Sequence, residues 1–126
     1  MKKITINDKE YDINCNAFTR FQYKKIFGIG MLADIKKLNE IYEEQENIKK
    51  NFKGSKEELE KAINNVTMEK LDDLIDVIER ITYILIYTAN EKIGTFEDWL
   101  KNIDKINLTE SWIGEVTETA VSSFLG

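Results

Sequence analysis

Apolar and polar residues alternate along the first fifteen positions of this chain, and the spacing of the apolar positions then becomes helical. Ile4, Ile6, Tyr11 and Ile13 share one face of two short segments, with the polar run 7–10 between them. A period of two on both sides of a polar turn is typical of a β-hairpin. We therefore expect a hairpin over residues 1–15 and helices over residues 16–126.

Two pairings of the predicted strands keep the same apolar face. One places Ile6 opposite Tyr11 and Ile4 opposite Ile13, so that apolar side chains are direct cross-strand neighbours. The other places Ile4 opposite Tyr11 and gives a tight Asn7-Asp8 turn, whose residues both tolerate left-handed backbone angles. We favour the first pairing, because four apolar contacts should outweigh the preference of the turn.

The first predicted helix spans residues 17–27, with Asn16 as its N-terminal cap and Gly28 as the residue that closes it. Its expected buried residues are Ala17, Phe18, Phe21 and Ile26. A second helix starts near Met31, and its apolar stripe becomes sparse beyond Tyr42. We expect that second half to project into solvent or to rest on another molecule.

The region 51–65 is the weakest join in the chain, and we expect a flexible connection there. Ser55 and Glu58 have the spacing of a capping box, which predicts a short helix to about Asn64. The longest helix then starts at Asn65 or Thr67. Its later part, from Ile81 on, is apolar on all sides, as is typical of a central core helix.

Two further helices complete the pattern. Thr95 caps a short helix whose Phe96 and Trp99 face inward, and Asn107 or Thr109 opens the last helix, which continues to the end of the sequence. At 126 residues the length is typical of one domain. The expected fold is therefore mainly α, a single domain 1–126 in which an N-terminal β-hairpin precedes a bundle of about five to six helices.

Composition narrows the classes of function. The net charge is −5, and the paired lysines are isolated rather than arranged in a basic stripe, so we expect no nucleic-acid binding. The single cysteine excludes an internal disulfide and favours a reducing cytoplasm. No apolar run approaches the ~20 residues of a membrane span, and the start of the sequence lacks a secretory signal pattern.

The sequence offers little catalytic chemistry. It has no histidine, which excludes the usual Ser-His-Asp and Cys-His machinery and histidine-bearing zinc sites. Adjacent acids are expected on polar helix faces or in first turns, where they offset the helix dipole; these pairs are Glu43-Glu44, Glu57-Glu58, Asp72-Asp73 and Glu97-Asp98. We therefore expect no enzymatic activity, no cofactor and no bound metal. A metal-dependent hydrolase that uses paired carboxylates is the least favoured alternative.

Some large apolar residues fit either a core or a partner contact. Trp112 lies one position before the apolar row of the last helix, and tryptophan is favoured in the central contacts of interfaces. Phe124 and Leu125 lie near the end of the sequence, where they either dock on this domain or bind a partner.

The succession of patterns resembles the tail assembly chaperones of long-tailed bacteriophages and related phage-tail-like particles. The similarity begins with residues 4–11, ITINDKEY, and the helices that follow Phe18. It continues in residues 95–100, TFEDWL, and in the Trp112-bearing helix that runs to residues 123–126, SFLG. It covers most of the chain in order and is thinnest between Glu40 and Asn65.

This resemblance implies a non-enzymatic protein of the host cytoplasm, absent from the mature particle, which binds the tape-measure protein and helps to recruit tail-tube subunits. A homo-oligomer is also compatible with it. The hairpin edge could pair with another strand, the last helix could lie in a partner's groove, and the acidic surface would suit a basic or mixed helical client. The expected partner-binding residues are Ile4, Ile6, Tyr11, Trp112, Val116, Phe124 and Leu125. The alternative is a structural head–tail connector subunit that stays in the particle.

Overall fold

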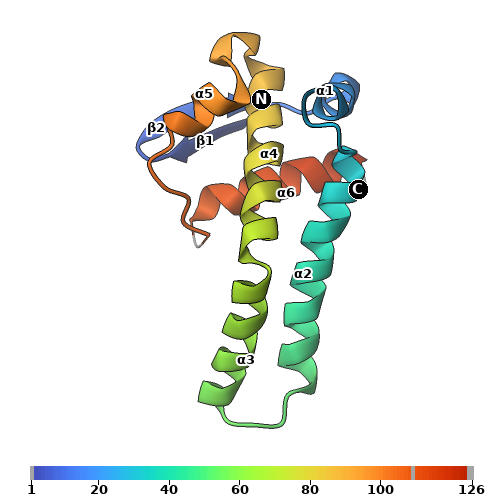
Figure 1. Cartoon of the computed structure of the whole chain (residues 1–126), viewed down its shortest axis with the longest axis vertical. Coiled ribbons are helices and arrows are strands. Elements are labelled where there is room, and N and C mark those ends of the chain that lie inside the picture. The colour runs from blue at the N-terminus through green and yellow to red at the C-terminus, as the bar shows by residue number, and fades with distance from the viewer. Residues whose placement is uncertain (1, 109, 125–126) are drawn as a thin grey trace.

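The computed structural model describes residues 2–108 and 110–124, and in these residues it consists of a two-stranded hairpin followed by six α-helices (Figure 1). The predicted fold class is confirmed. The elements are β1 (Lys2–Ile6), β2 (Lys9–Ile13), α1 (Ala17–Phe27), α2 (Met31–Asn51), α3 (Lys56–Glu69), α4 (Leu71–Ala89), the 3₁₀ turn η1 (Glu91–Ile93), α5 (Phe96–Lys101) and α6 (Ser111–Phe124).

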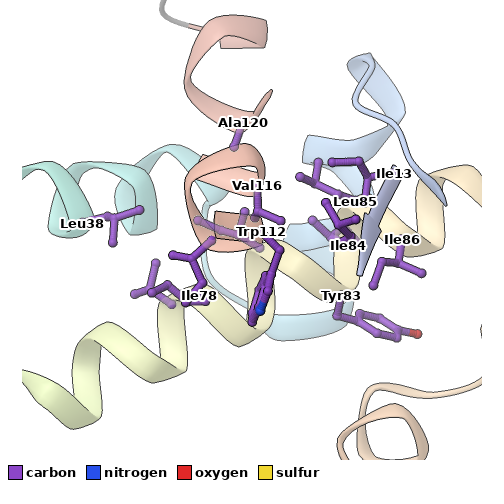
Figure 2. Packing of buried hydrophobic residues seen from close by; sticks show 14 of the residues in the cluster. Ile13, Leu38, Ile78, Tyr83, Ile84, Leu85, Ile86, Trp112, Val116 and Ala120 are labelled. Atoms are coloured by element: carbon purple, nitrogen blue, oxygen red, sulfur yellow. The ribbon is translucent and has the colours of Figure 1, made fainter. Parts of the chain in front are cut away.

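Helix α4 is the centre of the molecule, as its all-round apolar sequence predicts. Every residue from 81 to 86 is buried, and α4 packs against α1, α2, α6 and β2. Figure 2 shows Trp112 and Val116 of α6 pointing into the cluster that Ile78 of α4 helps to form, with Ile13 of β2 close to Leu85. The hairpin lies on this core, and the Asn14 amide donates to the Leu85 carbonyl oxygen at 3.1 Å.

The pairing that we favoured for the hairpin is wrong. The strands pair Ile4 with Tyr11 and Ile6 with Lys9, across a two-residue turn in which Asn7 and Asp8 have φ angles of 49° and 66°. Shifting the pairing by two residues leaves the apolar face unchanged, so core burial is the same in both registers. Turn chemistry decides between them, because two positive φ angles match the twist of a tight hairpin.

A second feature stabilises this turn from outside the hairpin. The Asn7 Oδ1 atom accepts hydrogen bonds from the backbone amides of Asp104 at 2.9 Å and Lys105 at 3.3 Å. The Asn7 amide nitrogen also donates to the Lys105 carbonyl oxygen at 3.1 Å. The turn is therefore held against the loop that joins α5 to α6.

The second half of α2 and the whole of α3 form an antiparallel pair that extends away from the rest of the molecule (Figure 1). Most of the region 51–65, expected as a flexible connection, is helical, and the link between the two helices is confined to residues 52–55. The second half of α2 extends away from the core, but it rests on α3 of the same chain, a contact that the sequence prediction did not include.

The boundary between α3 and α4 lies at Lys70, later than the predicted start at Asn65 or Thr67. Neither residue carries a helix-breaking side chain, so α3 continues to Glu69 before the backbone bends at Lys70, with φ −108° and ψ 9°. The Lys70 ammonium lies 3.8 Å from the Glu44 carboxylate of α2. The caps at Asn16, Gly28, Ser55 and Thr95 are found as predicted.

Candidate functional site

The hairpin residues expected to bind a partner are buried in the protein's own core. Ile4, Ile6 and Tyr11 are 3%, 1% and 8% exposed, because the apolar face of the hairpin covers α4 and α6. Their side chains are therefore not available at the surface of this fold. No third strand pairs with either outer edge of the hairpin in the described residues, so main-chain pairing is the contact that this element still offers.

The expected contact residues of the last helix are also directed inward. Trp112 and Val116 are 4% and 1% exposed, and Figure 2 shows both side chains in the core. Phe124 is partly buried against the same cluster, and Leu125 lies outside the described residues. The indole nitrogen of Trp112 donates to the Glu110 carboxylate at 3.0 Å, which satisfies its polar atom within the chain. Of the two alternatives for Trp112, burial in the core is the observed one.

Helix α1 presents the opposite face from the one predicted. Phe18, Phe21 and Ile26 are 48%, 61% and 40% exposed, whereas Thr19 and Tyr23 are fully buried. The expected burial of Ala17, Phe18, Phe21 and Ile26 is wrong, and hydrogen bonding explains why. The Thr19 hydroxyl lies 2.9 Å from the Thr88 hydroxyl of α4, so the more polar stripe faces the core.

Tyr23 fixes this orientation more firmly. Its hydroxyl donates to the Asp34 carboxylate in the first turn of α2. Its ring meets Phe27 edge-on, with the ring centres 4.9 Å apart. The inward row is therefore Thr19, Tyr23 and Phe27, at steps of four residues. This spacing is visible in the sequence, but more apolar residues occupy the other side of the helix, so the spacing by itself does not identify the inward face of α1.

The exposed side of α1 borders a groove at the start of α2. The groove has a volume of about 550 Å³ and is lined by Ala17, Arg20, Phe21, Lys24, Lys25, Gly30, Met31 and Leu32. We call this surface the α1–α2 groove. Gly28 allows the sharp turn between the two helices, because its φ of 69° is the left-handed conformation that closes α1. The Phe18 and Phe21 rings stack on each other beside the groove, with their centres 5.9 Å apart.

The rim of this groove is basic although the chain as a whole is acidic. Arg20, Lys24 and Lys25 all line it, and residues 13–33 include no aspartate or glutamate. None of these three cations forms an ion pair within the part of the chain that the structure describes. The groove therefore combines exposed apolar surface with uncompensated positive charge.

Beneath the groove, one buried carboxylate joins three helices. Asp34 of α2 is fully buried and receives hydrogen bonds from Tyr23 of α1 and from the Arg80 guanidinium of α4. Burial and the hydrogen bond to Asp34 raise the pKa of the Tyr23 phenol far above its ordinary value. Burial lowers the pKa of Arg80, but the hydrogen bonds to Asp34 and Tyr23 outweigh this effect and raise it. The hydrogen bonds among these three groups join the two helices that form the groove to α4.

The acidic pairs lie where the sequence predicted them. Glu57-Glu58, Asp72-Asp73 and Glu97-Asp98 are exposed in the first turns of α3, α4 and α5, where negative charge is favourable. Glu43-Glu44 is exposed on α2. Among the described residues, no three metal-ligating side chains are grouped closely enough to hold an ion. None of the helices described here has both the length and the apolar composition to cross a membrane.

No protein-family model, curated protein or solved structure matches this chain.

Proposed function

We propose that this chain is a non-enzymatic tail assembly chaperone of a long-tailed phage or a phage-tail-like particle. In this function it binds the tape-measure protein and helps to recruit tail-tube subunits around it. The proposal combines the sequence resemblance with one structural observation, the α1–α2 groove. That groove, rather than the hairpin face or the last helix, supplies the exposed side chains for binding another polypeptide.

The composition of the groove supports protein binding as the function. Exposed apolar side chains that occur singly are ordinary, but a contiguous group beside a concavity is typical of an interaction site. Phe18 and Phe21 are large, stacked on each other and substantially exposed, although Thr19 and Tyr23 occupy the buried face of the same helix. Aromatic residues with nearby arginine are also the residue types that contribute most at protein interfaces.

A groove of this size also suits a client with repeated sites. A short apolar contact binds weakly, because association must first offset the lost freedom of both partners. Many copies arranged along one elongated scaffold gain strength through multivalency without further contacts. A long helical tape-measure protein would supply such a row of sites.

Co-expression with candidate tail proteins tests the proposal. The reading frames adjacent to this gene should be sequenced, and any tube subunit or long helical protein that they encode should be expressed with the tagged full chain. We expect co-purification of the helical protein and absence of this chain from purified particles by mass spectrometry. Capture of neither protein, together with a strictly monomeric chain in light scattering, would contradict the proposal. Stoichiometric retention in particles would instead favour the connector alternative.

A further inference from the structure

Five of the large apolar side chains exposed in the described residues gather within residues 18–32, and the sixth, Met68, is distant in sequence on α3. The five are Phe18, Phe21, Ile26, Ile29 and Leu32. Phe21 and Leu32 line the α1–α2 groove itself. Exposed apolar side chains are therefore concentrated in α1, in the turn that follows it and in the first residues of α2, and two of them line the groove.

We infer that the α1–α2 groove binds an acidic amphipathic helix of a partner protein. This inference rests on the proposed function and deepens it, since it names the surface and the chemistry of the client.

The shape of the site favours a helix over an extended strand. Among the described residues, the groove is lined by α1, Gly30 and the start of α2, so no described strand edge borders it. A third helix can pack its apolar ridge between two helices, with anchors at steps of three, four and seven residues. Helix α1 has 11 residues, so at the standard rise it is about 16 Å long and matches a client of about three turns.

The positive charge at the rim of the groove determines that the partner helix carries negative charge. Arg20, Lys24 and Lys25 have no ion-pair partner in the described structure, and the next acid after Asp12 is the buried Asp34. Carboxylates on either side of an apolar helix stripe would pair with these cations, whereas a basic helix would be repelled. The total charge of −5 predicts a basic or mixed client, but the local charge at the groove has the opposite sign.

A membrane surface is the other occupant that a basic aromatic helix can bind. Two observations favour the protein helix. Phe21 and Leu32 line a concavity, whereas an interfacial helix inserts a convex face into the lipid. The chain also carries a net charge of −5, which opposes approach to an anionic bilayer.

A matched pair of labelled peptides tests whether the groove binds an amphipathic helix and whether that helix must be acidic. One peptide of about 14 residues carries leucine at every third or fourth position and glutamate on the flanks, and its partner has lysine in place of each glutamate. Fluorescence anisotropy with the full chain should show saturable binding of the acidic peptide, at least tenfold tighter than that of the basic one. Raising the salt concentration should weaken the binding.

Variants assign this binding to the groove. Phe21→Ser and the double change K24E/K25E should each lower the affinity for the acidic peptide about tenfold. K24Q/K25Q should give a smaller loss and a weaker dependence on salt. Met68→Ser and K49E/K50E are the matched controls, because they alter an exposed apolar residue on α3 and an adjacent lysine pair at the far end of α2. They should change the affinity by less than twofold, with circular dichroism checking that each variant is folded.

Each contrary result overturns the inference. Equal affinity for the two peptides, no saturable binding of the acidic peptide, or an equal loss in the control variants would do so. Phe21-dependent sedimentation with phosphatidylglycerol vesicles, without peptide binding, would assign the groove to membranes. If the tail proteins are captured equally well by Phe21→Ser, the proposed function stands and this inference fails. If the acidic peptide binds in the groove but neither tail protein is captured, the inference stands and the proposed function fails.

Discussion

Arg80 of α4 binds the buried carboxylate of Asp34 of α2 at two points, with Nε 2.9 Å from Oδ2 and Nη2 3.2 Å from Oδ1. Tyr23 of α1 donates to the same carboxylate. Because Asp34 is fully buried, these bonds replace its lost hydration, and each of the three helices contributes one of the groups. This arrangement fixes the start of α2 against α1 and so determines the shape of the groove between them.

Asp34→Ala should lower the free energy of unfolding by about 3 kcal/mol, because it leaves a largely buried guanidinium without its partner. Urea unfolding followed by circular dichroism measures the loss. Replacing both partners, as Asp34→Leu with Arg80→Met, should recover much of it, since apolar residues of similar size often substitute for a buried pair. Lys36→Ala, which removes an exposed ion pair with Glu40, is the control and should change stability by less than about 0.5 kcal/mol. A similar loss in Lys36→Ala and Asp34→Ala would contradict this role.

Tyr23 should make the fold sensitive to alkaline pH. Burial and the hydrogen bond to Asp34 raise the pKa of its phenol above the ordinary value of about 10. The folded state therefore holds this proton more tightly than the unfolded state. The protonated Tyr23 phenol therefore makes its full contribution to the free energy of unfolding below about pH 10, and this contribution is lost as the pH rises further. Tyr23→Phe should make the fall in unfolding free energy above pH 10 shallower.

The measurement is urea unfolding at a series of pH values from neutral to about 12. At neutral pH, Tyr23→Phe should itself cost about 1.5–3 kcal/mol, because one hydrogen bond to a buried carboxylate is lost. Tyr83→Phe is a useful companion, since burial and then the charge of Tyr87 also raise the pKa of Tyr83. The double variant should show the shallowest alkaline decline. Parallel curves for Tyr23→Phe and the natural chain would show that Tyr23 is not the group responsible.

The sequence predicts the architecture well where periodicity alone decides it. The hairpin, the central helix and the capped helix ends all follow from local spacing and local hydrogen bonds. The inward face of α1 does not, because Thr19 and Tyr23 face the core through bonds to Thr88 and Asp34. Those partners are distant along the chain or on another helix, so an apolar pattern read within α1 selects the wrong side.

The same limit applies to the candidate site. The residues proposed from sequence as partner contacts are the most apolar ones on their elements, and this is also what a core requires. Ile4, Ile6 and Val116 are therefore buried. Phe21, which the pattern assigns to the core, is exposed at the groove instead. An apolar residue is expected to be buried. Its apolar character does not show whether it is buried in the core of this chain or against a partner.

The hairpin turn gives a matched test of the observed register. Asp8→Gly should raise the free energy of unfolding by up to about 1 kcal/mol, because glycine adopts the φ of 66° without the penalty of a side chain. Asn7→Gly relieves the same kind of strain but removes the hydrogen bonds to Asp104 and Lys105. It should therefore destabilise the fold by about 1 kcal/mol. Thermal unfolding compares the two variants, and a gain in both would show that the Asn7 side chain contributes nothing.

The two glycines beside the groove should respond differently to the same substitution. A Cβ atom added at either Gly28 or Gly30 would meet no atom within 4 Å, so packing does not separate them. Gly28 has a φ of 69°, where a side chain costs about 1–2 kcal/mol, whereas Gly30 has a φ of −70°, which any residue adopts. Urea unfolding should therefore show a loss of about 1–2 kcal/mol for Gly28→Ala and a smaller loss, about 0.5 kcal/mol, for Gly30→Ala, because glycine is also preferred to alanine at the N-cap of α2. Because Gly28 closes α1 and leads into α2, Gly28→Ala should also weaken binding of the acidic peptide. Equal effects of the two substitutions on stability would mean that the left-handed turn is not what joins the helices.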